Sequence, residues 1–155
     1  GELYNISIGV GYTMPFQLIC APWIEADKFC DRMNGLNLKG IVFRPIHIKP
    51  YYSQSKGENI QGVQLYVTDV LDADLTMVQF HAMEVLAEMY PEKRLLDEDG
   101  QGTLGNRWNM FDKVCGTNKI RIEFSKNYKV ADIIEYWNKD VDAFKEKSKK
   151  YYIYN

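Results

Sequence analysis

The sequence predicts a single α+β domain, with a small mixed or antiparallel sheet on which about four helices pack. Segments with the alternating pattern of strands all precede Asp69, interrupted by one helical segment, and almost everything after Asp69 has helical periodicity. The 155 residues are enough for one domain with its own core. No internal repeat or interdomain linker divides residues 1–155, so we expect one folding unit.

The composition excludes several classes of protein. Hydrophobic residues make up 46% of the chain and charged residues 26%, which is ordinary for a globular protein. The net charge of -2 gives no electrostatic reason to expect a nucleic-acid partner. No apolar run approaches the roughly 20 residues that span a bilayer, so we expect no membrane span. An aromatic fraction of 14%, mostly from 11 tyrosines, favours contact with carbohydrate or peptide.

Alternation of apolar and polar residues predicts the strands. Residues 3–8 form a short segment rich in β-formers, and residues 16–20 form a second one that ends at Pro22. Residues 41–48 form another strand, and Pro45 within it predicts an edge or a bulge, because proline cannot donate to the ladder.

The last strand follows Gly62. Its inward face is formed by Val63, Leu65 and Val67, which leaves Gln64 on the opposite face. We therefore expect Gln64 to point away from the core.

Helical spacing predicts the other elements. Residues 26–33 place apolar side chains on one face, and Asn34-Gly35 ends this helix. A second helix is expected over residues 74–90, with His81 beside its apolar stripe as a packing residue rather than a ligand.

Two short helices and a long one are expected in the rest of the chain. The short ones cover residues 111–116 and the residues after Thr117. The long one begins near residue 130 and ends in a lysine-rich turn, which complements the negative end of the helix dipole. Its apolar face is formed by Val130, Ile133, Ile134, Trp137, Val141 and Phe144.

The sequence indicates no metal or cofactor. Cys20, Cys30 and Cys115 have neither CxxC spacing nor a histidine at metal-ligand spacing, and the first two lie in apolar patterns as small hydrophobes. The acidic residues 97–99 lack the later positions of an EF-hand. The chain opens on Gly1 without a charged and apolar leader, which fits a processed protein or a domain cut from a longer chain, and leaves open whether that glycine is native.

The stretch from Lys49 to Asp69 holds the best candidate for a binding loop. It combines adjacent Tyr51 and Tyr52 with hydroxyls, amides, a lysine and a carboxylate, a mixture that suits a polar ring-shaped ligand. An ordinary surface connection is the alternative. Earlier in the chain, the glycines of residues 9–11 would either hold the backbone close to a ligand or make a tight turn.

Several blocks, taken in order along the chain, carry a resemblance to a known family. They are residues 5–17 (Asn-Ile-Ser-x-Gly-x-Gly-x-Thr-x-Pro-Phe-Gln), residues 21–24 (Ala-Pro-Trp-Ile), residues 43–45 (Phe-Arg-Pro), residues 53–57, residues 62–69 (Gly-Val-Gln-Leu-x-Val-Thr-Asp), Phe111-Asp with Gly116-Thr, and the closing helix with Trp137, Phe144 and a tyrosine-rich end. Together these blocks cover nearly the whole chain. They resemble the carboxy-terminal domain of the exo-β-N-acetylmuramidases of the NamZ/YbbC type.

The resemblance implies an auxiliary domain of a glycoside hydrolase. Enzymes of this family release N-acetylmuramic acid from the non-reducing end of peptidoglycan fragments, and their main catalytic groups lie on an amino-terminal Rossmann-like domain. The carboxy-terminal domain closes the cleft from the other side. This implies that the partners are the Rossmann-like domain of the same polypeptide and a peptidoglycan-derived sugar, that the chain alone is inactive, and that the setting is periplasmic or exported, with the cytoplasm left open.

Three positions depart from the family pattern. Val10 stands where the family commonly has the arginine of Gly-Arg-Gly-Thr, and Gln54 stands where a lysine commonly follows the serine of the central loop, with Lys56 two places later. Tyr66 occupies a position that is often histidine. These departures bear on the identity of the sugar more than on the fold, and they leave the natural sugar open.

Glycoside hydrolysis normally uses two carboxyl groups, ~5–5.5 Å apart for retention or ~6.5–9.5 Å for inversion. The candidates within this chain are Glu58 and Asp69. We expect Asp69 to bond locally to the turn before the next helix and Glu58 to be a solvated loop residue, with substrate contact by Glu58 left open. His47 and His81 have no evident nucleophile partner, so no Ser-His-Asp set is predicted.

The resemblance and the loop chemistry together predict a substrate-binding surface that faces the amino-terminal domain. Its residues are Thr13, Tyr52, Ser53, Gln54, Lys56 and Gln64. Two alternatives stay open. One is a stand-alone carbohydrate-binding module in which Tyr51, Tyr52 and Trp23 stack on sugars, and the other is a structural module that only docks a partner domain.

Overall fold

The predicted α+β class is confirmed by the computed structural model, which describes residues 3, 5–52, 55–93, 95–96 and 108–154. Within these ranges the elements are β1 (Leu18–Ala21), α1 (Ala26–Gly35), β2 (Ile41–Ile48), β3 (Ile60–Val67), α2 (Val78–Met89), α3 (Trp108–Cys115), α4 (Lys119–Asn127), the 3-10 turn η2 (Val130–Asp132), α5 (Ile134–Asn138), α6 (Val141–Ser148) and the 3-10 turn η3 (Lys149–Tyr151). The strands form an antiparallel sheet in the order β1-β3-β2.

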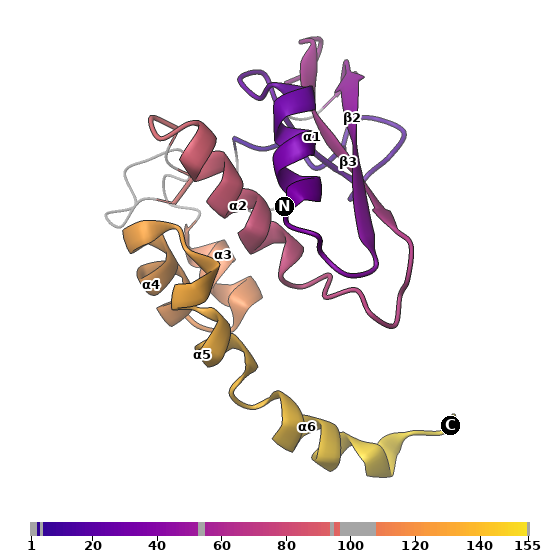
Figure 1. Cartoon of the computed structure of the whole chain (residues 1–155), viewed down its shortest axis with the longest axis vertical. Helices are drawn as coiled ribbons and strands as arrows, with labels where there is room; N and C mark the ends of the chain where they lie inside the picture. Colours follow the sequence, from indigo (N-terminus) through magenta and orange to yellow (C-terminus); the bar gives the residue numbers. More distant parts are fainter. Residues whose placement is uncertain (1–2, 4, 53–54, 94, 97–107, 155) are drawn as a thin grey trace.

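Helices cover one face of this sheet. Figure 1 shows α1 against the sheet, α2 beside α1, and α3 to α5 gathered beyond α2. The core between these layers is apolar and fully buried, and it includes Phe29 and Met33 of α1, Val63 of β3, and Phe80 and Leu86 of α2. Each such side chain contributes about 1.5–3 kcal/mol on burial, so this contact holds the two halves of the domain together.

The opposite side of the sheet, which we call the outer face, has its own smaller apolar cluster. Leu18, Cys20, Ile48 and Ile60 form it, and part of residues 9–17, which we call the glycine loop, packs over them. The glycine loop is able to double back because Gly9 and Gly11 have φ of +85° and +93°, which side-chain-bearing residues rarely adopt. A Cβ on Gly9 would lie 2.3 Å from the carbonyl oxygen of Met14, so the turn is also too tight for a larger residue.

The strand predictions were right for the hairpin and partly wrong before it. β2 covers the predicted residues 41–48 and lies at the edge of the sheet, as Pro45 indicated. The predicted strand at residues 3–8 is reduced to a single bridge between Ser7 and Cys20, because the chain turns away at Gly9. Phe16 has a left-handed φ of +66°, so β1 begins at Leu18.

The predicted apolar face is confirmed for α1 but only in part for α2, whose buried side also includes Phe80 and Met83, and both helices have ends that the sequence did not reveal. The N–H of Ala26, the first residue of α1, donates a hydrogen bond of 3.0 Å to Oε1 of Gln61. α2 begins at Val78 rather than residue 74, because the carboxylate of Asp74 accepts hydrogen bonds from Thr76 Oγ1 at 2.7 Å and from the N–H of Met77 at 3.3 Å. The preceding turn is therefore built around Asp74.

Asn34, near the end of α1, has a role beyond stopping the helix. Its Oδ1 accepts from the N–H of Phe43 at 2.9 Å, and its Nδ2 donates to the carbonyl oxygen of Phe43, also at 2.9 Å. The thiol of Cys30 approaches the same carbonyl at 3.3 Å. The side-chain amide thus forms both hydrogen bonds that a neighbouring strand would form, and it fastens α1 to the edge of β2.

The predicted long final helix is wrong, because it breaks between Asn138 and Val141 into α5 and α6. The stripe before the break is packed: Trp137 meets the ring of Phe80 edge-on at 5.2 Å. The stripe after the break is exposed, with Phe144 at 67%. α6 leads away from the body of the domain (Figure 1). None of the described helices is long and apolar enough to cross a membrane.

Two glutamates of α2 tie three parts of the domain together. Glu88 pairs with Arg32 of α1 and with Lys129, which follows α4. Glu84 accepts from the same Lys129 at 3.1 Å and from the N–H of Val130 at 2.7 Å. The hydrogen bond from Lys129, followed by that from Arg32, lowers the pKa of the Glu88 carboxyl below its ordinary value despite partial desolvation.

This arrangement predicts an acid-sensitive contribution to stability. Because the folded-state pKa of Glu88 is lowered, its stabilising effect is present above the unfolded value of about 4.3 and is lost as the pH falls through the folded value. We expect Glu88→Gln to lower the free energy of unfolding at about pH 7 and to make it less dependent on pH between about 5 and 3. Urea unfolding at several pH values measures both quantities. Glu146→Gln, which breaks an exposed pair on α6, is the matched control, and equal pH dependence in Glu88→Gln and wild type would contradict the prediction.

Candidate functional site

Two polar loops meet at the end of the sheet where β2 leads into β3. The glycine loop and residues 49–59, which we call the hairpin loop, are joined by a main-chain hydrogen bond of 2.9 Å from the N–H of Tyr51 to the carbonyl oxygen of Gly11. Two of the predicted site residues, Thr13 and Tyr52, therefore sit on neighbouring loops, and both are exposed. The sequence separates these loops by about forty residues, and folding the sheet brings them together.

The described residues of the hairpin loop are joined to one another by backbone hydrogen bonds. The N–H of Gly57 donates to the carbonyl oxygen of Pro50 at 2.7 Å, and Ser55 and Gly57 both adopt left-handed φ values. The loop exposes Lys56, as predicted. The predicted residues Ser53 and Gln54 lie outside the residues that the structure describes.

The aromatic pair of the hairpin loop is accessible. The rings of Tyr51 and Tyr52 meet edge to face, with centroids 4.8 Å apart, and the two side chains are 71% and 48% exposed. Trp23, the third aromatic of the stacking hypothesis, instead meets Tyr90 edge-on at 5.2 Å. Trp23 is half-buried against the core, so it is engaged in packing.

Gln64 lies on the outer face, as its position in the strand predicted, but it is buried there rather than open to a ligand. Its side chain is only 4% exposed because the glycine loop returns over this part of the sheet. Its Oε1 accepts from the hydroxyl of Tyr66 at 2.9 Å, and its Nε2 donates to Oε1 of Gln17 at 3.3 Å. Gln64 therefore positions its neighbours and is shielded from direct contact with solvent.

A polar hollow lies between the two loops and the end of the sheet. Its volume of about 500 Å³ falls in the range of small-ligand sites. It is lined by Tyr12, His47, Ile48, Lys49, Asn59, Ile60 and Gln61. None of these polar side chains was among the binding residues predicted from the sequence. His47 and Lys49 alternate at the end of β2, and that spacing was the available signal that both turn toward one place.

A second cavity has a different character. It measures about 160 Å³ and lies where residues before β1 meet α2 and α3, with a lining that is mostly aliphatic and includes Cys115. Its size is below that of typical ligand sites, and its walls offer few groups for a polyhydroxylated ligand. The polar hollow is therefore the better candidate for a sugar.

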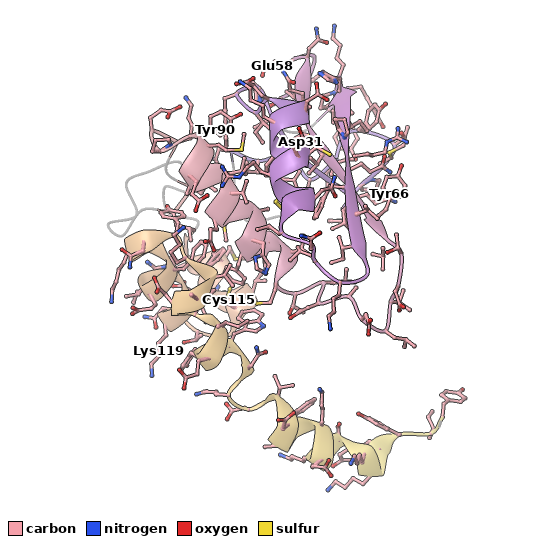
Figure 2. All side chains as sticks on the ribbon, in the orientation of Figure 1. Asp31, Glu58, Tyr66, Tyr90, Cys115 and Lys119 are labelled. Carbon is pink, nitrogen blue, oxygen red and sulfur yellow. The ribbon has the colours of Figure 1, made fainter. Side chains whose placement is uncertain are left out.

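The two candidate carboxylates cannot act as a pair. Glu58 precedes β3 and Asp69 follows it, and a strand of eight residues extends about 23 Å, far beyond the separation that glycoside hydrolysis requires. The carboxylate of Asp69 accepts from the N–H of Leu71 at 2.9 Å, which confirms the predicted local role. Figure 2 shows Glu58 at the loop end of the sheet and Tyr66 further along, on the side away from α1.

The cysteines are unsuited to nucleophilic chemistry. Burial raises the pKa of the Cys20 thiol to about 12 and that of Cys115 to about 11, and it also raises the pKa of Cys30. These thiols stay protonated near neutral pH, and a protonated thiol is a poor nucleophile and metal ligand. Among the described residues, no three His, Cys, Asp or Glu side chains are arranged to hold a metal ion.

Comparison with known proteins places this chain in a family. Residues 1–154 match the family model of the exo-beta-N-acetylmuramidase NamZ, C-terminal. The chain is 33% identical over 150 residues to the peptidoglycan beta-N-acetylmuramidase NamZ of Bacillus subtilis (strain 168), an alignment that covers 97% of this chain and 34% of that protein.

A solved structure is similar over the whole chain. The crystal structure of a DUF1343 family protein from Bacteroides fragilis matches with a TM-score of 0.90 and 44% identity, covering 100% of this chain and 39% of that one. The chain thus spans little more than a third of the length of the relatives it matches. The match of the family model over nearly every residue, supported by both relatives, shows that this chain belongs to the family of carboxy-terminal domains of NamZ-type exo-β-N-acetylmuramidases.

Proposed function

We propose that this domain is the auxiliary half of an enzyme that releases N-acetylmuramic acid from peptidoglycan fragments, and that its two loops close the cleft over the sugar. The observation that carries the proposal is the junction of the glycine loop and the hairpin loop by the hydrogen bond between Tyr51 and Gly11. It joins the loops that carry Thr13, Tyr52 and Lys56, all three of which are exposed, and the polar hollow lies at the same end of the sheet, which supports a site that combines aromatic faces with hydrogen-bonding groups.

The catalytic groups are assigned to the amino-terminal part of the polypeptide. The separation of Glu58 from Asp69 by the whole of β3 supports this assignment, because it removes the carboxylate pair that the sequence offered. The length of the relatives leaves room for a preceding domain that would supply them. A periplasmic or exported setting stays a prediction from the family.

A carbohydrate-binding module without catalysis is the second candidate. The observation that favours it is the exposed, edge-to-face pair of Tyr51 and Tyr52, because rigid aromatic faces bind sugars at small entropic cost. In that case the chain alone would bind muramyl fragments with the same affinity as the full-length polypeptide.

The test compares three proteins for release of N-acetylmuramic acid from a chromogenic β-N-acetylmuramide. We expect the full-length polypeptide to be active, the 155-residue chain to be inactive, and the full-length double variant Tyr52→Ala, Lys56→Ala to turn over substrate at least tenfold more slowly, since each lost ligand contact is worth about 1 kcal/mol or more. Thermal unfolding is the control, and we expect the double variant to stay within about 0.5 kcal/mol of wild type. Turnover by the chain alone, or an unchanged rate in the double variant, would overturn the proposal.

A further inference from the structure

The outer face carries an arginine that has no carboxylate partner among the described residues. Arg44 of β2 is exposed, and its guanidinium carbon lies 5.7 Å from the ring centroid of Tyr66 on the adjacent strand β3. The other described arginines differ, because Arg32 pairs with Glu88 and Arg121 with Asp112. Arg44 therefore lies over an aromatic ring, and its N–H groups have no carboxylate acceptor among the described residues.

The ring of Tyr66, over which Arg44 lies, is held by hydrogen bonds to residues of the outer face. The hydroxyl of Tyr66 donates to the side-chain amide oxygen of Gln64, and the side-chain N–H of Gln64 donates to the side-chain amide oxygen of Gln17. The main-chain carbonyl oxygen of Gln17 in turn accepts from the N–H of Leu65 at 2.9 Å. These bonds join the side chains of Gln17, Gln64 and Tyr66 to the backbone of β3. Burying an amide beneath an exposed face costs desolvation unless it is bonded, and here the bonds orient the ring of Tyr66 over which Arg44 lies.

The surroundings of the pair are apolar and open. Val42 pairs with Tyr66 across the two strands and is 44% exposed. Phe16 directly precedes Gln17, the partner of Gln64, and is 77% exposed; it is held at a left-handed φ of +66°, with its N–H bonded to the carbonyl oxygen of Ile8 at 2.7 Å. A bulky residue rarely adopts this conformation, and its cost is tolerated mainly where the side chain must be presented in a set direction.

We propose that Arg44, stacked on Tyr66, receives the carboxylate of the substrate's muramyl residue. This inference rests on the proposed function, because it takes the substrate class from it. N-acetylmuramic acid differs from N-acetylglucosamine by a lactyl ether that ends in a carboxylate, and a guanidinium fork matches a carboxylate with two parallel hydrogen bonds.

A pre-positioned guanidinium favours a ligand over a docking contact with protein. A rigid supporting layer matters where a small molecule must be oriented, whereas a salt bridge between domains tolerates a mobile side chain at its rim. Gln64 acts through Tyr66 in this arrangement, so it is a positioning residue and not one that touches the sugar.

The test measures how the full-length enzyme distinguishes a charged from a neutral ligand. Inhibition of turnover by free N-acetylmuramic acid is compared with inhibition by its neutral carboxamide, in wild type, Arg44→Gln, Arg44→Lys and, as a charge-matched control, Lys113→Gln on the exposed side of α3. We expect wild type to prefer the acid by roughly tenfold to a hundredfold, the range that follows from a hydrogen bond to a charged group. Arg44→Gln should abolish this preference, Arg44→Lys should restore part of it, and Lys113→Gln should leave it unchanged.

The outcomes separate the two proposals. A wild-type polypeptide that releases no N-acetylmuramic acid would refute the proposed function itself. An active enzyme whose preference for the acid survives Arg44→Gln would refute the role of Arg44 and leave the function standing. If Arg44→Gln instead lowers the thermal stability of the full-length polypeptide without changing the preference, Arg44 pairs with a carboxylate of the amino-terminal domain, and the ligand proposal is overturned.

Discussion

Replacing Gly62 by alanine is expected to lower the free energy of unfolding by about 3 kcal/mol, at the upper end of the usual cost of overpacking. Gly62 lies in the central strand β3, between Cys20 of β1 and Ile46 of β2. A Cβ at this position would be 2.0 Å from the carbonyl oxygen of Ile19 and 2.8 Å from Cα of Cys20. Both obstacles are backbone atoms, so a side chain can be accommodated only by moving β1 away from β3.

Gly35→Ala is the matched control for this experiment. A Cβ on Gly35 would meet nothing within 4 Å, and the residue lies at the end of α1, where alanine is a better helix former than glycine. We expect this variant to be as stable as wild type or more stable by up to about 1 kcal/mol. Urea unfolding of both variants measures the difference, and similar stabilities would show that β1 is not held against Gly62 as described.

The second large effect is expected at the centre of the helical layer. Phe80→Ala should cost about 3–5 kcal/mol, because the side chain is fully buried and its loss leaves a cavity. Phe80 meets the rings of Phe111, Phe124 and Trp137 edge-on, with centroids 6.4, 5.3 and 5.2 Å away. It is therefore the one side chain through which α2 touches aromatic rings of α3, α4 and α5 at once, within the described part of the chain.

Phe144→Ala offers the same chemical change on a surface. Phe144 is 67% exposed on α6, so the domain alone should lose no more than about 0.5 kcal/mol. Thermal unfolding followed by circular dichroism compares the two variants directly. Equal losses would mean either that the core around Phe80 closes over the cavity or that α6 folds back onto the domain, and both contradict the arrangement described here.

The sequence predicted correctly those elements in which the periodicity of apolar residues agrees with the glycine or proline that limits the element. α1 has four apolar residues on one face and a glycine at its end, and β2 has an alternating pattern with a proline that belongs at an edge. The final helix shows why such predictions have limits. The apolar stripe continues from Trp137 to Phe144, but periodicity describes only one surface and cannot tell whether a second surface is there to cover it.

The candidate site was predictable to a similar degree. The resemblance pointed to the glycine loop and the hairpin loop, but nothing in the pattern of either loop encodes the hydrogen bond from Tyr51 to Gly11 that joins them. The alternation of residues along β3 correctly predicted the face on which Gln64 lies, but it did not reveal that the side chain is buried there. Alternation predicts the face of the sheet to which a side chain points. Whether another segment covers that side chain depends on long-range packing, here on the glycine loop that folds back over the outer face.

The contact between Asn34 and Phe43 bears on how this sheet meets other polypeptide chains. An open edge strand is a template on which a further strand can assemble, and such growth leads to strand exchange or fibres. On β2 that template is blocked at two successive outward positions, because the amide of Asn34 occupies the N–H and carbonyl of Phe43 and Pro45 has no N–H to offer. Strand addition along β2 is therefore hindered in the middle of the strand, so we expect another chain that meets this edge to do so mainly through side chains.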